Sequence, residues 1–392
     1  MDVIRDNPLD HRLLLVNGRI YAGGRVIDNG SLLVGSEGRI EAVGGTELRS
    51  AEAPVRDVQG SMVLPGFIDV HVHGGGGYQM MDGNYEGIAG MSWFHAAHGT
   101  TSFLATTDSA SEEAILKALR NASEAEAKGL NGAELLGVHL EGPFLHPIRG
   151  GAQDKRHIRP ASRSELERYV EASGSRIRLV TLAPEIEGGF EAVDMLTRLG
   201  ITVSIGHSDA TYAQVLEAVR RGATHTTHHF NGMSPFHHRE PGVAGAGLML
   251  SELTTELIAD GIHVHPAAVK LLFETKGARR VCLITDAVSC AGLPDGEYGH
   301  LAMKDGQIWL KDGSSLAGSS LTMLKALKNV LAYTGYPLEG LLPSLTEVPA
   351  RQIGVSDRKG SLEAGKDADL LILDDELNLL STFVRGREVY AR

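Results

Sequence analysis

Short apolar runs alternate with longer amphipathic stretches through the middle of the chain, from about Pro65 to Gly340. The runs have the length of buried parallel strands, and the stretches between them carry apolar residues at helical spacing. Eight such strands with helices between them favour a closed α/β barrel, the (β/α)8 fold, over an open sheet. The predicted strands are Phe67–Val70, Thr101–Ala105, Leu135–Leu140, Ile177–Leu182, Thr202–Ile205, Thr224–Thr227, Glu256–Ala259 and Val281–Thr285. The predicted helices are Glu112–Lys128, Ser164–Ala172, Phe190–Leu199, Tyr212–Arg221 and Pro266–Lys276.

Both ends of the chain instead carry the pattern of short strands separated by tight turns. Two similar ends around a different middle indicate one discontinuous domain, residues 1–65 and 346–392, beside a barrel domain of residues 66–345. The predicted N-terminal strands are Leu13–Val16, Arg19–Tyr21, Ser31–Val34 and Arg39–Val43, with turns at Asn17-Gly18, Gly23-Gly24 and Glu37-Gly38. The predicted C-terminal strands are Asp369–Leu373, Leu379–Arg385 and Glu388–Ala391, with a turn at Arg385-Gly386.

The composition, 42% hydrophobic and 22% charged over 392 residues, is ordinary for a soluble globular protein. The formal net charge of −12 argues against a nucleic-acid partner, although a local basic pocket could still hold a small anionic substrate. Cys282 and Cys290 do not make a disulfide framework. Because Met1–Asp10 lacks the apolar segment of a signal peptide and no stretch is long enough to span a bilayer, we expect a cytoplasmic protein without a membrane partner.

Residues that can bind a metal or move a proton stand at the ends of the predicted strands. In a (β/α)8 barrel the C-terminal ends of the strands converge on one mouth, where active sites form. We therefore expect these residues to meet in space although they are far apart in sequence. They are His71 and His73 after the first strand, Glu141 after the third, His207 after the fifth, His228 at the end of the sixth and Asp286 after the eighth.

His71 and His73 flank one residue, so on an extended backbone both imidazoles point to the same face. This suits two ligands of one cation, and a plain surface or core role fits the pair equally well when it is taken alone. Glu141 at the end of a buried strand needs a partner, because an unpaired buried charge is costly. A cation held by histidines would serve, and so would an ordinary salt bridge.

A single histidine at a strand end more often makes ordinary hydrogen bonds than binds a metal. We expect this plain role for His139, His225 and His229. His207 and His228 follow strands whose ends should face the same mouth, and the resulting set of imidazoles and a carboxylate suits Zn²⁺ or Fe²⁺.

Asp286 follows the last predicted barrel strand and could take a proton from water and deliver it to a leaving nitrogen. A nearby cation would keep its carboxylate ionised. Its alternative role is that of another metal ligand, and the two roles can coexist. Arg239 is a candidate for binding phosphate, because a guanidinium forks onto that group, while a surface ion pair with Glu240 is its alternative. His263 is a second candidate for a phosphate or a hydroxyl.

Several motifs together resemble the amidohydrolase superfamily. The broad marks are the run from Pro65 to His73 at the start of the barrel and the run from Gly360 to Leu370 near the end of the chain. Narrower motifs, in order over nearly the whole chain, resemble the family of N-acetylglucosamine-6-phosphate deacetylases. They are His139 to Phe144, Gly206-His207-Ser208, Thr227 to Met233 with Ser234-Pro235, Arg239 to Gly242, Ala259 to His263, Thr285-Asp286-Ala287 and Leu316 to Ser319.

The resemblance implies a barrel with a small β-sandwich formed by both termini, and a homodimer or a higher oligomer. It implies hydrolysis of N-acetyl-D-glucosamine 6-phosphate to D-glucosamine 6-phosphate and acetate, in amino sugar catabolism and cell-wall recycling. It implies one or two divalent ions per subunit, either zinc or iron. Glu141, His207 and His228 would bind the first ion. His71 and His73 would bind the second, and Glu141 would bridge the two ions. Asp286 would be the general base and acid. The implied substrate contacts are Ala152, Asn231, Gly232, Arg239, Asp260, Gly261, Ile262, His263, Leu316, Ala317 and Gly318, with Arg239 and His263 the candidates for action across a dimer.

One motif departs from the family, and three other functions stay open. Gly151-Ala152-Gln153 stands where the family often has Gly-Ala-His. Ala152 still offers its backbone, but Gln153 cannot become a cation, and His146 and His157 are the nearby substitutes. The other functions are deacetylation of N-acetylgalactosamine 6-phosphate, another N-acyl amidohydrolase activity, and a non-catalytic scaffold. Retention of all six strand-end residues argues against the scaffold.

Overall fold

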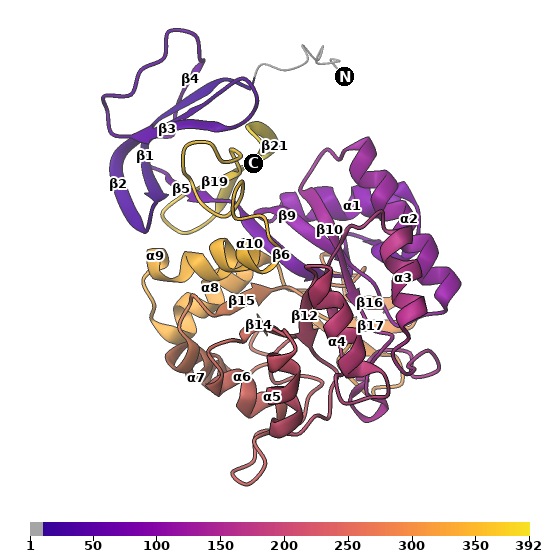
Figure 1. Cartoon of the computed structure of the whole chain (residues 1–392). Coiled ribbons are helices and arrows are strands. Elements are labelled where there is room, and N and C mark those ends of the chain that lie inside the picture. The colour runs from indigo at the N-terminus through magenta and orange to yellow at the C-terminus, as the bar shows by residue number, and fades with distance from the viewer. Residues whose placement is uncertain (1–10) are drawn as a thin grey trace.

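The computed structural model describes residues 11–392 and consists of two parts (Figure 1). The larger part is a barrel of strands surrounded by helices. The smaller part, at the upper left of the figure, is a sheet that contains strands from both ends of the described chain. The expectation that Met1–Asp10 carries no signal peptide concerns residues outside those described.

Eight parallel strands form the barrel in the order of the sequence, which confirms the predicted (β/α)8 fold. Each strand coincides with a predicted one to within two residues at either end. The barrel closes where the backbone N–H of Asp286 donates to the carbonyl oxygen of His71 at 2.9 Å. The strands are β6 (Phe67–Val72), β9 (Thr100–Thr106), β10 (Glu134–Glu141), β11 (Ile177–Leu182), β12 (Thr202–Ile205), β13 (His225–Thr226), β14 (Thr254–Ile258) and β15 (Val281–Ile284).

The helices predicted from apolar periodicity all form, and α2 and α7 have the predicted bounds. Ser111 caps the start of α2, because its hydroxyl accepts from the N–H of Ala114. The helix buries Ile115 and Leu119 against the barrel. Among the helices of residues 11–392, none combines the length and the apolar character needed to cross a bilayer. The predicted helices are α2 (Glu112–Lys128), α3 (Arg163–Ala172), α4 (Gly189–Arg198), α5 (Tyr212–Arg220) and α7 (Pro266–Lys276).

Within residues 11–392, five further α-helices form where the sequence predicts none. α6 (Gly242–Met249) is rich in glycine and buried almost all round, so it lacks both helix propensity and an amphipathic period. α8 (Met323–Thr334) does carry such a period, with Met323, Ala326 and Leu327 buried, and Thr322 caps its start. The others are α1 (Tyr85–Ala96), α9 (Leu338–Leu341) and α10 (Glu347–Gln352).

The two ends of the described chain share one sheet, in which β5 (Met62–Pro65) pairs with β1 on one side and with β19 on the other. β1 also pairs with β2 and β4, so the sheet branches around it over a core that includes Leu15, Ile20 and Phe383. The remaining strands are β1 (Leu13–Ala22), β2 (Arg25–Val34), β3 (Ile40–Gly44), β4 (Val55–Asp57), β19 (Leu370–Leu373), β20 (Leu379–Val384) and β21 (Arg387–Ala391).

The predicted turn at Asn17-Gly18 is wrong, because both residues lie inside the single strand β1. Asn17 has φ 57°, and the pairing with β2 shifts register between Leu15 and Gly18. The pair is therefore a β-bulge, in which the left-handed residue increases the twist without reversing the chain. The predicted turns at Gly23-Gly24 and Glu37-Gly38 do form between strands.

Lys359 links the C-terminal segment to the barrel. Its side chain is fully buried, and its Nζ lies 2.5 Å from Glu134 at the start of β10 and 2.6 Å from Asp369. Asp367 is a third partner at 3.0 Å. Because a buried ammonium is costly unless it is paired, these carboxylates hold the C-terminal run from Gly360 to Leu370 against the barrel.

A small antiparallel sheet follows β15 and is tied to loops of the barrel mouth. It consists of β16 (Gly296–Tyr298), β17 (Leu301–Lys304) and β18 (Gln307–Leu310). Ala152 and Ala317 pack into its apolar core. A second short hairpin, β7 (Gly74–Gly75) with β8 (Tyr78–Gln79), follows β6.

Candidate active site at the barrel mouth

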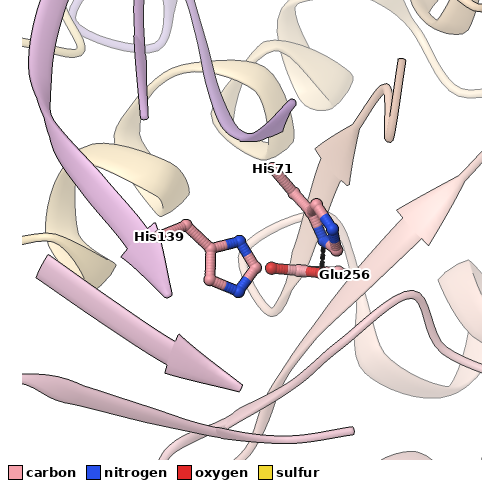
Figure 2. A group of neighbouring side chains, drawn as sticks. All are labelled: His71, His139 and Glu256. Atoms are coloured by element: carbon pink, nitrogen blue, oxygen red, sulfur yellow. Dashed lines mark hydrogen bonds and ion pairs between the residues drawn. The ribbon is translucent and has the colours of Figure 1, made fainter. Parts of the chain in front are cut away.

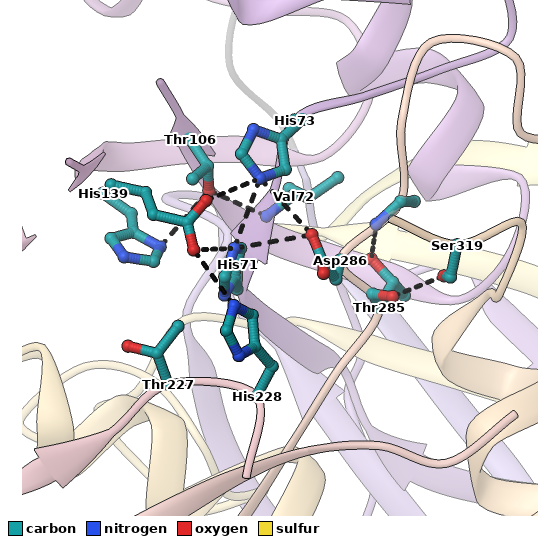
Figure 3. Close-up of polar contacts among 12 residues, drawn as sticks. His71, Val72, His73, Thr106, His139, Thr227, His228, Thr285, Asp286 and Ser319 are labelled. Atoms are coloured by element: carbon teal, nitrogen blue, oxygen red, sulfur yellow. Dashed lines mark hydrogen bonds and ion pairs between the residues drawn. The ribbon is translucent and has the colours of Figure 1, made fainter. Parts of the chain in front are cut away.

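The six predicted strand-end residues meet at one end of the barrel. Figure 3 shows His71, His73, His228 and Asp286 turned toward one another between the ends of the strands. The side chains are almost completely buried, and Asp286, at 12% exposure, is the most accessible of the six. The carboxylate of Glu141, from the end of β10, lies among the four imidazoles.

Glu141, His207 and His228 form the first of two groups. Oε1 of Glu141 lies 3.3 Å from Nε2 of His207 and 3.3 Å from Nε2 of His228. The two Nε2 atoms are 3.1 Å apart. One carboxylate oxygen and two ring nitrogens thus face a common point, and one atom from each residue could bind a single ion there.

His71, His73 and Asp286 form the second group. The Nε2 atoms of His71 and His73 are 3.3 Å apart, and Oδ1 of Asp286 lies 3.5 Å and 3.3 Å from them. Oε2 of Glu141 is 3.2 Å from Nε2 of His73, so that carboxylate lies between the two groups.

The geometry and the unsatisfied atoms both fit divalent cations. Oε1 of Glu141 is buried and has no hydrogen-bond donor, which is costly unless a cation is its partner. Ligand atoms about 2.0–2.2 Å from a tetrahedral ion lie about 3.3–3.6 Å from each other, close to the separations within each group. Imidazole and carboxylate ligands suit zinc or iron.

Each of the four imidazoles turns Nε2 to the centre and Nδ1 to an outer oxygen atom. This arrangement fixes the tautomer and the ring orientation, as is usual for histidines that bind metals. The outer partners are Glu256 for His71 at 2.9 Å, Asp108 for His73 at 2.8 Å, the carbonyl oxygen of Arg149 for His207 at 2.7 Å and that of Asn231 for His228 at 3.1 Å.

The charges of the site shift the pKa values of its members in opposite directions. Burial opposes a charged His71, but Glu141, Glu256 and Asp286 raise its pKa well above the ordinary value. Burial also opposes ionised carboxylates, but the imidazoles, with His71 foremost, hold the pKa of Glu141 well below its ordinary value. The pKa of Asp286 is likewise lowered by His71 and His73, although burial opposes this shift. The carboxylates are therefore ionised at neutral pH, which is the form that binds a cation or accepts a proton.

Three residues of the site have left-handed backbone conformations, which residues other than glycine seldom adopt. The φ angles are 47° at His207, 28° at His228 and 52° at Asp286. Each lies where the chain leaves a barrel strand, so the turn brings the side chain over the mouth. Strained residues of this kind cluster at functional sites.

Three other histidines lie outside the first and second groups: His139, His225 and His229. His139 contacts Thr181 at 2.7 Å, and burial lowers its pKa well below the ordinary value. Burial also lowers the pKa of His229, to about 3, so this ring is neutral. The plain hydrogen-bonding role expected for them stays a prediction, because His139 also forms, with His71 and Glu256, a third set of side chains close enough to hold an ion.

Gln153, the departure from the family pattern, contacts the centre directly. Its Nε2 donates to Oε2 of Glu141 at 2.7 Å, and its Oε1 accepts from the backbone N–H of Ser109 at 2.6 Å. The amide therefore holds the carboxylate that lies between the two groups. His146 and His157, the suggested substitutes, take part in other contacts, with the N–H of Ile148 and with Asp154.

Most of the predicted substrate-binding residues border the mouth. A Cβ added to Gly232 would lie 3.0 Å from Nδ1 of His207, so only glycine leaves this approach open. The carbonyl of Asp286 accepts from the N–H of Ser319 at 2.8 Å, and Gly318 lies beside the same carbonyl. Leu316 and Ala317 precede them and pair with β18.

His263 and Asp260 form a second polar pair after β14. Nδ1 of His263 lies 2.7 Å from Oδ2 of Asp260, and the other oxygen of Asp260 accepts from the N–H groups of Ile262 and His263. Burial opposes protonation of His263, but Asp260, and to a lesser extent Asp286, raise its pKa. Gly261 connects the pair with φ 81°.

Arg239 does not join these residues within the described chain. It is exposed on the loop between β13 and α6, and its Nη1 contacts the ring of its neighbour His238 at 2.8 Å. Glu240, the expected surface partner, accepts instead from the backbone N–H of Tyr212.

Sequence reasoning missed the carboxylates behind the histidines. Asp108 follows β9, so the same strand-end rule could have found it. Glu256 lies inside β14, where a single acidic residue in an otherwise uncharged buried strand was the available signal.

Comparison with known proteins agrees with this arrangement. The amidohydrolase family model matches residues 62–389. The chain belongs to the amidohydrolase family. Proteins of this family are metal-dependent, in keeping with the clustered histidines and carboxylates. An N-acetylglucosamine-6-phosphate deacetylase of Bacillus subtilis is 42% identical over 383 residues, which are 95% of this chain and 96% of that protein.

Two further relatives bear on the substrate. An N-acetylgalactosamine-6-phosphate deacetylase of Escherichia coli O157:H7 is 37% identical, with 85% of this chain and 89% of that protein covered. The structure of a mutant N-acetyl-D-glucosamine-6-phosphate deacetylase from Mycobacterium smegmatis, in complex with N-acetyl-D-glucosamine-6-phosphate, is 32% identical with a TM-score of 0.91. That match covers 97% of this chain and 100% of the other.

Proposed function

We propose that this amidohydrolase removes the acetyl group from N-acetyl-D-glucosamine 6-phosphate and releases acetate and D-glucosamine 6-phosphate. The observation that carries the proposal is the group of Glu141, His207 and His228, which faces Asp286 at the mouth of the barrel. The relatives with similar sequences over most of their length are named for this reaction.

In this proposal Glu141, His207 and His228 would hold one divalent ion, and His71, His73 and Asp286 would hold a second beside Glu141. Zinc and iron are the proposed metals, because both accept imidazole and carboxylate ligands. When bound, such an ion makes water acidic enough to supply hydroxide at neutral pH and polarises the acetyl carbonyl.

Asp286 performs the proton transfers in this account. Its ionised carboxylate accepts a proton from the attacking water, and it then gives that proton to the sugar nitrogen as the C–N bond breaks. The depressed pKa of Asp286 keeps it ready to accept at the start of the cycle. At 12% exposure it is the most accessible of the six central residues, as contact with substrate requires.

The sugar phosphate would bind above this centre, among Ala152, Asn231, Gly232, His263 and the segment 316–318. The exposed position of Arg239 supports a role at a neighbouring subunit, so we propose a homodimer in which Arg239 binds the phosphate across the interface. Contacts to the phosphate would supply binding energy remote from the amide. We retain the cytoplasm as the proposed compartment, since both cysteines are free thiols.

Deacetylation of N-acetylgalactosamine 6-phosphate is the second candidate, favoured by the 37% identity to the Escherichia coli enzyme of that name. The test is acetate release from three substrates at equal concentration: the two N-acetylated hexosamine 6-phosphates and unphosphorylated N-acetylglucosamine. We expect the glucosamine phosphate to have the highest kcat/KM. A preference for the galactosamine epimer would select the second candidate, and full activity on the unphosphorylated sugar would contradict both.

A further inference from the structure

Glu256 is a carboxylate with no solvent exposure that lies beneath the histidine centre. It comes from within β14, whereas the six central residues lie at strand ends. A charge in this position is costly unless several polar groups surround it. Its contacts therefore indicate what it is there to hold.

One oxygen of Glu256 contacts both groups of the centre. Oε2 lies 2.9 Å from Nδ1 of His71, as Figure 2 shows, and accepts from the backbone N–H of His228 at 3.0 Å. His71 belongs to the second group and His228 to the first. The carboxylate thus ties the ring of one candidate ligand to the main chain of another.

Glu256 has two further contacts within the barrel. Oε1 lies 3.3 Å from Nε2 of His225, and the backbone carbonyl of Glu256 accepts from the N–H of His229 at 2.9 Å. The ring of His139 packs edge-on against the ring of His71 with centroids 4.4 Å apart, so His71 is confined on a second side (Figure 2).

Glu256 differs from the other three outer acceptors. His207 and His228 use backbone carbonyl oxygens, and His73 uses Asp108, whose side chain is 46% exposed. Water screens the charge of Asp108, whereas nothing comparable screens Glu256. A buried carboxylate on Nδ1 holds the proton there and leaves the Nε2 lone pair directed at the centre, which makes the ring a stronger ligand.

We propose that Glu256 is a positioning residue that determines the affinity of the second metal position, by fixing His71 as an Nε2 ligand. The inference rests on the proposed function for the presence of metal, and goes beyond it by assigning the control of the second ion to a residue outside both groups. The hydrogen bond to His228 contributes less to the first position, because that group retains Glu141, His207 and the ring of His228 itself.

The test is titration of metal-free protein with Zn²⁺ or Co²⁺, followed by calorimetry and, for cobalt, by the visible absorption spectrum. Wild type should bind two ions per subunit. Glu256→Gln, which keeps the shape but not the charge, should bind the first ion as wild type does and the second roughly 10- to 100-fold more weakly. The matched control is Glu165→Gln on α3, which removes a buried carboxylate whose partners are Arg159 and Tyr169 and none of the six central residues, and it should bind both ions normally.

A double-mutant cycle separates positioning from a general structural effect. In a His71→Ala background, Glu256→Gln should weaken the second ion no further, because the ligand through which it acts is gone. Glu256→Asp keeps the charge but withdraws it by one methylene, and it provides the same test if Glu256→Gln does not fold.

Unchanged affinity for both ions in Glu256→Gln would overturn the proposal, as would equal weakening of both ions or a wild type that binds a single ion. Failure of the proposed function has a different signature. In that case wild type and Glu165→Gln would bind no ion, or would bind two ions and release no acetate.

Discussion

The backbone N–H of Asp286 donates to the carbonyl oxygen of His71 at 2.9 Å and joins the last barrel strand to the first. The same closure places Oδ1 of Asp286 3.5 Å from Nε2 of His71. The carboxylate proposed to transfer protons and an imidazole proposed to bind metal are thereby brought together by one backbone contact. This part of the site is thus positioned by the closure of the barrel itself.

Asp286→Asn should reduce acetate release by about 10²- to 10⁴-fold, because an amide cannot accept and return a proton. The ion held by Glu141, His207 and His228 should remain, as measured by metal analysis of the purified variant. Asp305→Asn is the matched control, since Asp305 also has φ 52° but lies in an exposed turn. An Asp286→Asn enzyme with wild-type turnover would remove Asp286 from this role.

Gln153→Ala should lower metal affinity by roughly 10- to 100-fold, because Glu141 loses the donor that holds its Oε2. Gln153→Glu should lower it further, since a second carboxylate would stand where the 2.7 Å hydrogen bond now lies. Competition with a chromophoric chelator measures both affinities, and Gln307→Glu on the exposed strand β18 serves as the control. Wild-type affinity in Gln153→Glu would show that Gln153 does not hold Glu141.

The metal-free protein should lose thermal stability as the pH rises above about 6.5, the ordinary pKa of histidine. Burial opposes the charged imidazoles, but the neighbouring carboxylates raise the pKa values of His71 and His73 well above this value. A histidine whose pKa is higher in the folded state than in the unfolded state stabilises the fold fully below its unfolded-state pKa. This stabilisation is lost as the pH rises through the folded-state pKa.

Calorimetric Tm values from pH 6.5 to about 9 provide the measurement, because the loss of stability begins near the ordinary pKa of histidine. Without metal, Tm should fall across the interval. With zinc, the neutral imidazoles bind the ion and the decline should be smaller or reversed. A metal-free Tm that is constant or rises over the same interval would contradict the assigned charges.

Arg239→Ala should raise KM for the phosphorylated substrate by about 10- to 100-fold with little change in kcat, as expected for loss of a hydrogen-bonded ion pair with phosphate. Activity on unphosphorylated N-acetylglucosamine should not change. Arg163→Ala on α3 removes an exposed arginine elsewhere and should behave as wild type. An unchanged KM in Arg239→Ala would place the phosphate contact elsewhere.

Strand-end positions could be predicted because the barrel itself imposes them. A polar residue directly after a buried strand must lie at the mouth, and this located His207, His228 and Asp286 without knowledge of their contacts. Glu256 could not be assigned in this way, because its role depends on which ring nitrogen it faces across the barrel. A sequence pattern contains no such information.

The wrong turn at Asn17-Gly18 has an equally specific cause. Asn17-Gly18 favours a left-handed conformation, but whether the chain then turns or bulges depends on the neighbouring strand. The predicted phosphate contact of Arg239, with action across a dimer, stays a prediction, and in the single chain this residue is exposed. A residue that would act across an interface can be placed in the site only when the neighbouring subunit is present.

Metal-dependent deacetylation is tested most directly by acetate release from N-acetyl-D-glucosamine 6-phosphate. One protein preparation is compared in three states: as purified, after removal of metal by a chelator, and after addition of zinc or ferrous iron. Chelation should abolish release, and adding metal back should restore it. Undiminished release by protein shown to be metal-free, or no release by fully metal-loaded protein, would contradict metal-dependent deacetylation.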